Sequence, residues 1–168
     1  HLYAAMIPNC RSYDPCYGYE LTVILQHGMV EMYENQKDVF YYVTIMNENY
    51  LHPAIPKDKD ADMIKGIYLL DADEGPRVDI LASGAILREA EAAVEILRAN
   101  GISIRLWSVT SWSEAARHAR DDPEFLQFDA GVVVAVSDYV KAVPYLLTEY
   151  IQKPYYVLGT DGFGMSDT

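Results

Sequence analysis

The second half of the chain alternates between short apolar runs and amphipathic segments. Residues 78–82 and 131–136 are mostly apolar and contain several β-branched side chains, which is typical of strands. Residues 85–99 repeat apolar side chains at a spacing of three and four, so they predict a helix with one buried face. The same patterns predict further strands at 65–70, 102–109 and 155–158, a helix starting with Ser111, and a helix from Ser137-Asp138 to about Tyr150. This alternation is typical of an α/β fold with three layers and a mostly parallel sheet of about five strands.

The first part of the chain has a different pattern. Residues 2–7 predict a short strand, and residues 38–46 predict a buried strand rich in aromatic and β-branched side chains. Between them, residues 16–33 have one apolar face, and Asp14-Pro15 provides an N-cap followed by a proline in the first helical turn. We therefore expect a strand–helix–strand piece that belongs to another sheet.

A stretch with two prolines and many charges separates the two parts. We place a linker at residues 53–63, between a first domain at 1–52 and a second domain at 64–168.

Charge and composition exclude several classes of protein. The formal net charge is -12, from 25 acidic and 13 basic side chains, which argues against nucleic acid as a partner. No apolar run approaches the roughly 18 residues that span a membrane. Cys10 and Cys16 lie close together without metal-ligand spacing, so we interpret them as free thiols in a reducing cytoplasm.

The candidate metal ligands lack the spacing that a metal site needs. None of the 4 histidines lies three or four residues from another. Asp58, Asp60 and Asp62 begin like a calcium loop, but Met63 and Leu69 occupy the positions of its essential Gly and Glu. We predict no metal site in this chain.

Three other groups of residues could bind a ligand. Asn47, Glu48 and Asn49 follow a predicted strand, where parallel sheets bind ligands, although such residues also cap strand ends. Ser83-Gly84 joins a strand to a helix and could hold an anion, although tight packing is the better interpretation. The Gly159–Gly164 loop could form an anion nest or simply a series of turns.

Several strings together resemble the homodimeric pyruvate dehydrogenase decarboxylases, which are members of the transketolase-like group of thiamine enzymes. They follow the family's order and cover nearly the whole chain: IPNCRSYDP from Ile7, FYYVT and MNENY between Phe40 and Tyr50, PAIP from Pro53, KGIY from Lys65, SGAILR from Ser83, WSVTS from Trp107 and LGTDGFGMSD from Leu158.

The resemblance implies an activity and a set of partners. The complete enzyme would decarboxylate pyruvate on thiamine diphosphate with Mg²⁺ and transfer the acetyl unit to a lipoyl group of the acyltransferase component, as a homodimer in the cytoplasm. His1 stands where the group places a catalytic histidine next to the reacting carbon. Asn47, Glu48 and Asn49 would line the substrate channel, and the second domain would serve dimer packing.

The chain also departs from the family. It is shorter near residues 125–131, it ends where relatives continue, and it contains neither the diphosphate-binding domain nor most of the pyrimidine domain. We therefore expect either a fragment that is inactive alone or a longer chain with segments left out. Two alternatives stay open: a non-catalytic doubly wound module that binds an anion, and another thiamine enzyme such as transketolase or a branched-chain dehydrogenase.

Overall fold

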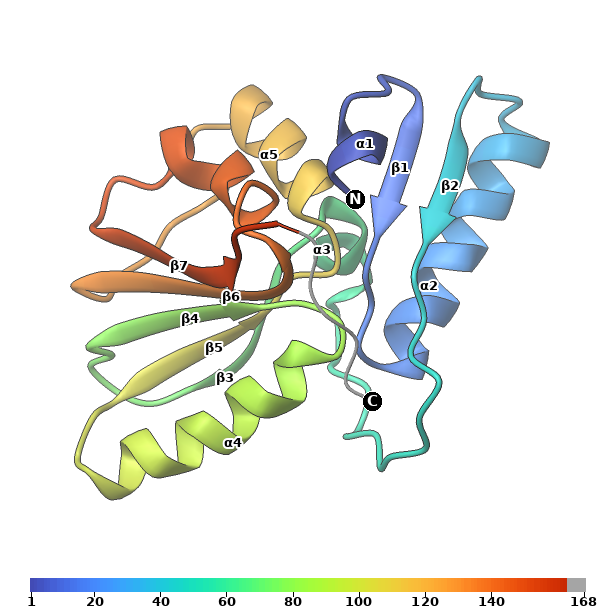
Figure 1. Ribbon diagram of the computed structural model, residues 1–168. Coiled ribbons are helices and arrows are strands. Elements are labelled where there is room, and N and C mark those ends of the chain that lie inside the picture. The colour runs from blue at the N-terminus through green and yellow to red at the C-terminus, as the bar shows by residue number, and fades with distance from the viewer. Residues whose placement is uncertain (163–168) are drawn as a thin grey trace.

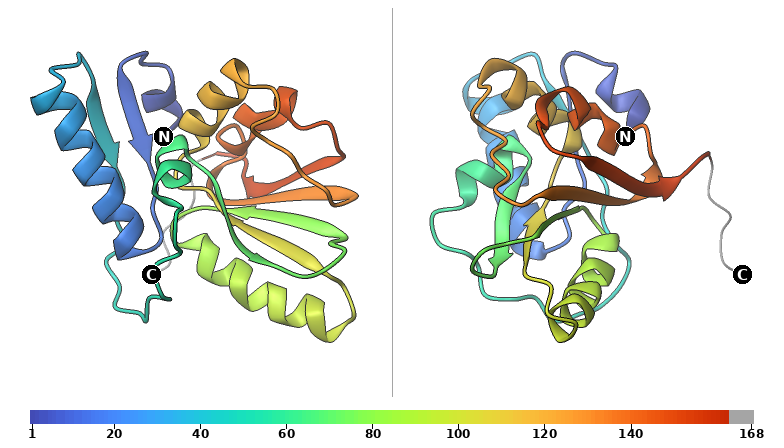
Figure 2. Two further views of the ribbon diagram at one scale, coloured as in Figure 1. Left: turned by 180° about the vertical axis from the view of Figure 1, so that it is seen from behind. Right: turned by 90° about the vertical axis from the view of Figure 1, so that its left-hand side faces the viewer.

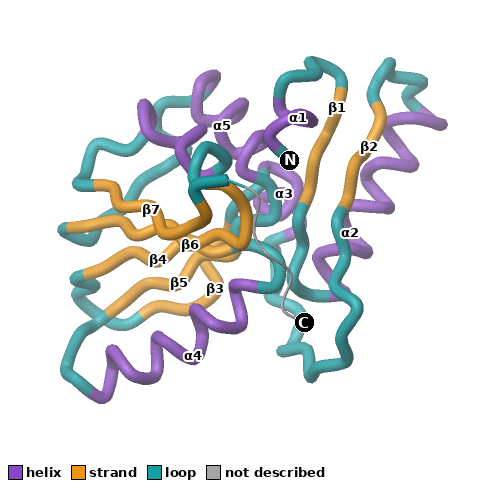
Figure 3. Tube along the Cα trace, in the orientation of Figure 1, coloured by secondary structure: helices purple, strands orange, loops and turns teal. Residues whose placement is uncertain are grey.

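The computed structural model describes residues 1–162, and its first elements form a small parallel unit (Figure 1). These elements are α1 (Leu2–Ala5), β1 (Cys10–Tyr13), α2 (Gly18–Met29), a π-helical turn η1 (Val30–Glu34) and β2 (Phe40–Val43). Strands β1 and β2 pair in parallel, with Cys10 opposite Phe40, and α2 forms the crossover between them. A long loop without regular structure then leads to the second unit (Figure 3).

The second unit is a mixed sheet with the strand order β3-β5-β4-β6-β7. Its elements are α3 (Asp60–Lys65), β3 (Tyr68–Ala72), β4 (Val78–Ala82), α4 (Ile86–Ala99), β5 (Ile104–Ser108), α5 (Trp112–Asp121), β6 (Val132–Val140), a 3-10 helix η2 (Pro144–Tyr150) and β7 (Tyr155–Thr160). The edge strand β3 is antiparallel to β5, and the other neighbours are parallel. This arrangement confirms the predicted three-layer, mostly parallel α/β fold.

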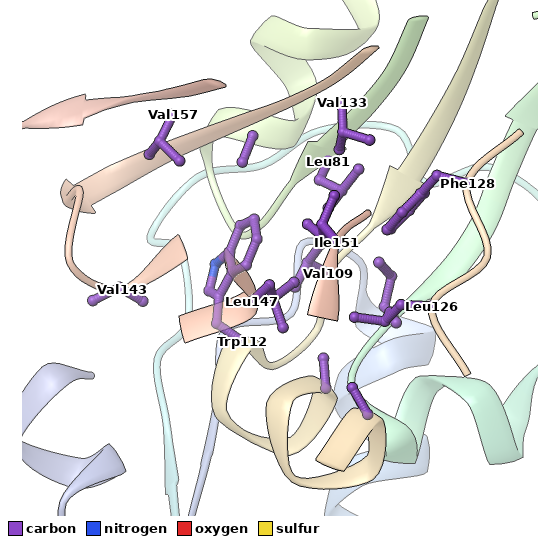
Figure 4. Close-up of a cluster of buried hydrophobic side chains, with 14 residues drawn as sticks. Leu81, Val109, Trp112, Leu126, Phe128, Val133, Val143, Leu147, Ile151 and Val157 are labelled. Atoms are coloured by element: carbon purple, nitrogen blue, oxygen red, sulfur yellow. The ribbon is translucent and has the colours of Figure 1, made fainter. Parts of the chain in front are cut away.

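Helices cover both faces of the five-stranded sheet (Figures 1 and 2). Successive strand residues point to opposite faces, so Ile80 and Leu81 belong to different cores. Leu81 packs with Trp112 of α5 and Leu147 of η2 (Figure 4). Ile80 belongs to the core under α4, which continues to Tyr17 and Tyr19 at the start of α2. The two units therefore share one of the cores.

Several predicted elements differ from the structure. Residues 2–7 were expected to be a strand, but α1 forms there, since the Ala4-Ala5 pair favours a helical turn over a strand. Helix α2 begins at Gly18 rather than after Asp14, and Glu20 caps it by accepting from the Tyr17 and Cys16 amides. Part of the predicted linker is helical, since α3 starts at Asp60 and ends at Lys65, and Gly66 caps it in the left-handed conformation.

The predicted helix over residues 137–150 is wrong. Strand β6 continues through Ser137 and Asp138 to Val140, and only the 3-10 helix η2 follows. Pro144 explains why no α-helix runs through this stretch, because a proline inside a helix lacks the amide hydrogen and its ring clashes with the preceding turn. At the first position of η2 the same proline is tolerated.

Candidate functional site

The carboxyl ends of strands from both sheets meet at one place. Asp14 directly follows β1, and Thr44 directly follows β2. Ser83-Gly84 follows β4 in the other sheet, and the Gly84 amide donates to the Asp14 carbonyl oxygen at 3.0 Å. The Asp14 amide in turn donates to the carbonyl oxygen of Thr110, two residues beyond β5, at 2.7 Å. Ligands of α/β folds bind at such strand ends, so this junction is our candidate site.

His1 lies at this junction and is half-buried. Its Nε2 is 3.1 Å from the hydroxyl oxygen of Thr44. Two aromatic rings flank the imidazole, with centroid distances of 4.6 Å to Tyr139 and 5.2 Å to Tyr42. Tyr42 belongs to β2 and Tyr139 to β6, so side chains from both sheets surround the histidine.

The carboxylate of Asp14 is the buried centre of the site, with 7% of the residue exposed. Its Oδ1 accepts from the Thr44 hydroxyl at 2.6 Å and from the Tyr139 hydroxyl at 3.2 Å. Burial raises the pKa of Asp14, while hydrogen bonds from Thr44, Ser83 and Tyr139 oppose that rise. Burial also raises the pKa of Tyr139 above its usual value, so this phenol stays a neutral donor near pH 7.

The Ser83-Gly84 turn packs tightly against the site. Gly84 has a φ of +50°, and a Cβ at this position would lie 2.4 Å from Asp14 Oδ2. The Asp14 carboxylate therefore fills the space beside the turn, and the Ser83 hydroxyl accepts from the Trp112 indole at 3.1 Å. The turn closes a contact between the two units rather than presenting an open anion site.

The structure does not bring Asn47, Glu48 and Asn49 to His1. All three residues are exposed in the loop after β2. Glu48 instead forms a salt bridge of 3.1 Å with Arg88 at the start of α4. The Arg88 guanidinium also lies over the Tyr50 ring, 4.5 Å from its centroid. These contacts hold the loop against the second unit.

Sequence reasoning missed three residues of the site. The sequence predicts a helix cap at Asp14, a strand that continues past Thr44, and a helix that contains Tyr139. No sequence signal indicates Asp14 or Thr44, because the pattern predicts no strand directly before Asp14 and extends the next strand past Thr44. Tyr139 could not be found either, because its place depends on how far β6 extends.

The other candidate sites in the described structure are less well defined. The Gly159–Gly164 loop is described only to Gly162, where Lys141 forms a salt bridge of 2.8 Å with Asp161, and Phe163 onward lies outside the described residues. A cavity of about 700 Å³ between α2, α3 and α5 is lined by acidic and basic residues and by two histidines, His27 and His118. Within residues 1–162, no group of three or more His, Cys, Asp or Glu side chains could hold a metal ion. The same part of the chain contains no helix long and apolar enough to cross a membrane.

Solved transketolases share this fold. The transketolase from Campylobacter jejuni matches 98% of this chain and 24% of its own with a TM-score of 0.64 at 20% identity. The transketolase from Leishmania mexicana matches 97% of this chain and 22% of its own with a TM-score of 0.61 at 16% identity. At these identities the likeness concerns the fold alone.

Curated sequences give a closer relationship. The pyruvate dehydrogenase E1 component of Pseudomonas aeruginosa is 44% identical over 190 residues, covering 100% of this chain and 22% of the relative. That of Escherichia coli K12 is 40% identical over 188 residues, covering 100% of this chain and 21% of the relative. The chain thus spans about a fifth of the length of these relatives.

Family models match both units. Residues 1–53 match the pyruvate dehydrogenase E1 component middle domain, and residues 66–168 match the transketolase-like TK C-terminal domain. The chain therefore belongs to the transketolase-like C-terminal domain family and joins this domain to a middle-domain segment of the pyruvate dehydrogenase E1 type.

Proposed function

We propose that this chain is the C-terminal part of a thiamine-diphosphate-dependent pyruvate dehydrogenase E1 component. The complete protein would decarboxylate pyruvate and transfer the acetyl unit to a lipoyl group of its acyltransferase partner. The observation that carries the proposal is 44% identity to such a component across the whole chain. A histidine at the junction of strand ends from two sheets supports it.

The described residues do not fit the diphosphate end of the cofactor. They contain no group of three or more His, Cys, Asp or Glu side chains that could hold a metal ion, and the Asp14 carboxylate fills the space beside the Ser83-Gly84 turn. Within the proposal, other parts of the complete protein hold the diphosphate and Mg²⁺, and this chain acts on the substrate. The cofactor supplies the electron sink for decarboxylation, as organic cofactors do in general.

His1 would act on a substrate oxygen that gains negative charge during the reaction. An imidazole can donate a hydrogen bond to such an oxygen or give it a proton, because histidine ordinarily titrates near neutral pH. Tyr42 and Tyr139 would limit the access of water to the ring from two sides. Asn47, Glu48 and Asn49 would border the entrance to the site rather than contact the reacting atoms.

We further propose a division into two domains, a homodimer and a location in the cytoplasm. We assign residues 1–52 to the end of the pyrimidine-binding domain and 64–168 to a C-terminal domain that packs in a homodimer. The two matched family segments support a boundary in the stretch between them. The buried thiols of Cys10 and Cys16 are both free, which supports a reducing cytoplasm.

Substrate choice tests the proposal directly. The full-length protein with thiamine diphosphate and Mg²⁺ should release carbon dioxide from pyruvate, and the signal should disappear without the cofactor. Ketose phosphates and branched-chain 2-oxo acids serve as competing substrates in parallel reactions. A clear preference for a ketose phosphate would replace this proposal with a transketolase, and no turnover of any substrate would support a non-catalytic module.

A further inference from the structure

The side chain of Thr44 connects His1 to a buried carboxylate. Its hydroxyl oxygen lies 2.6 Å from Asp14 Oδ1 and 3.3 Å from the carbonyl oxygen of Tyr13. Both partners are acceptors, so the single hydroxyl proton of Thr44 points to one of them. The Thr44 hydroxyl oxygen lies 3.1 Å from His1 Nε2 and can then only accept a hydrogen bond from it. The hydrogen bond between these residues therefore requires a proton on His1 Nε2.

Asp14 is itself held firmly. Its backbone is bonded to Thr110 and Gly84 of the second unit, and its Oδ1 also accepts from the Tyr139 hydroxyl at 3.2 Å. The Tyr139 hydroxyl lies 3.4 Å from the Thr44 oxygen as well. A carboxylate anchored by both sheets can fix the direction of the Thr44 hydroxyl more firmly than water can.

We propose that Asp14, Thr44 and Tyr139 are positioning residues that hold the His1 ring with its proton on Nε2 and leave Nδ1 to exchange a proton with the substrate. This inference rests on the proposed function, because it assumes that His1 acts on the substrate. Through Tyr139, the second unit would then contribute to the site in addition to packing in the dimer.

The hydroxyl of Thr44 can be removed with little change in shape. In the full-length protein, Thr44→Val should lower kcat roughly tenfold, the effect of losing one hydrogen bond that orients a reacting group, with little change in KM. Thr44→Ser keeps the hydroxyl and should recover most of the turnover. Thr22→Val serves as the matched control, because Thr22 is exposed on α2 and bonds only to the Gly18 carbonyl in the described structure.

The double variant shows whether Thr44 acts through His1. If it does, Thr44→Val should slow the wild type but cause no further loss in His1→Ala, because the group it positions is gone. An equal loss in both backgrounds, or a Ser variant as slow as the Val variant, would overturn the inference and leave the role of His1 standing. Wild-type turnover in His1→Ala would instead overturn the role of His1 and this inference with it.

A second measurement needs neither cofactor nor substrate. Diethyl pyrocarbonate modifies the unprotonated nitrogen of histidine, and peptide mass spectrometry gives the rate at His1. Thr44→Val should lower this rate, because the proton then distributes over both ring nitrogens and Nδ1 is no longer the unprotonated nitrogen in every molecule. Thr44→Ser should react at the wild-type rate, and equal rates in all three proteins would contradict the inference. Thr44→Ala replaces the Val variant if unfolding temperatures show that the latter does not fold.

Discussion

Glu20 is a fully buried carboxylate that joins three parts of the chain. Its two oxygens accept from the Cys16 and Tyr17 amides at 2.7 and 2.9 Å, and from the hydroxyls of Tyr68 and Ser108, both at 2.6 Å. Burial raises the pKa of Glu20, while these four hydrogen bonds oppose the rise. Two of the donors belong to β3 and β5, so the carboxylate ties the cap of α2 to the second sheet.

Removing this carboxylate should weaken the fold strongly. Glu20→Ala creates a cavity and leaves four buried donors without a partner. We therefore expect a loss of roughly 3 kcal/mol or more in the free energy of unfolding. Glu20→Gln should lose only about 1 kcal/mol, because the two hydroxyls can turn to accept from the new amide. Urea denaturation of the 168-residue chain measures both, with the exposed Glu34→Gln as control. Equal losses in the Ala and Gln variants would contradict this account of the network.

Among single residues, the sequence did not reveal which side chains bond to one another at the candidate site. The resemblance placed a catalytic group at His1, and the structure surrounds His1 with groups that can orient it. Asp14 was expected to cap α2, as Asp before Pro commonly does, but tertiary hydrogen bonds from Thr44 and Tyr139 take its carboxylate instead. A local pattern cannot reveal such a competition, because the competing donors lie 30 and 125 residues away.

At the scale of elements, the turn between β4 and α4 controls how closely the two units approach. Gly84→Ala adds a Cβ to a residue with φ of +50° and places it 2.4 Å from the Asp14 carboxylate. Gly75 is the matched control, because it has φ of +58° and no neighbour within 4 Å of such a Cβ. We expect a loss of about 1 kcal/mol for Gly75→Ala, from the backbone alone, and roughly 2 to 3 kcal/mol for Gly84→Ala.

Chemical denaturation of the two variants provides the comparison. The difference between them isolates the contact with Asp14, since the left-handed backbone is common to both. A Gly84→Ala protein as stable as Gly75→Ala would show that the turn can move away from Asp14 without cost.

Elements with a strong periodic pattern were predictable, and those that depend on distant contacts were not. Strand β4 and helix α4 lie where the apolar spacing places them, within a residue at each end. The Ser111 cap of α5 is also present, with its hydroxyl accepting from the Glu114 amide. The prediction is wrong after Val136, because Ser137-Asp138 is a good helix-capping sequence but does not start a helix. The pairing of β6 with β7 shifts register after Val136 and resumes at Val140, so the strand continues through this pair.

At the scale of the whole molecule, polar contacts fix how the two units meet. Arg11 of β1 forms a salt bridge of 3.1 Å with Glu114 of α5, and Asp14 and Glu20 bond to the second sheet. Buried polar contacts of this kind specify one arrangement, since sliding one unit past the other would leave charges without partners. The strand ends are thereby held together around His1.

The chain on its own should not bind the cofactor tightly. Its described residues contain no group of three or more side chains that could hold a metal ion, and no open anion turn. Calorimetry of the 168-residue chain with thiamine diphosphate and Mg²⁺ should therefore show no binding in the micromolar range. The full-length protein is the positive control. Micromolar binding by the isolated chain would mean that it contains a cofactor site that we have not recognised.

Under the proposed function, His1 of this chain acts on the substrate, while other regions of the complete protein bind the cofactor. His1→Ala in the full-length protein tests both roles in one pair of titrations. We expect pyruvate turnover to fall roughly 10²- to 10³-fold, the usual effect of losing a positioned acid–base or hydrogen-bonding group. The affinity for thiamine diphosphate should stay at the wild-type value. Turnover equal to wild type, or a loss explained wholly by weaker cofactor binding, would contradict the account.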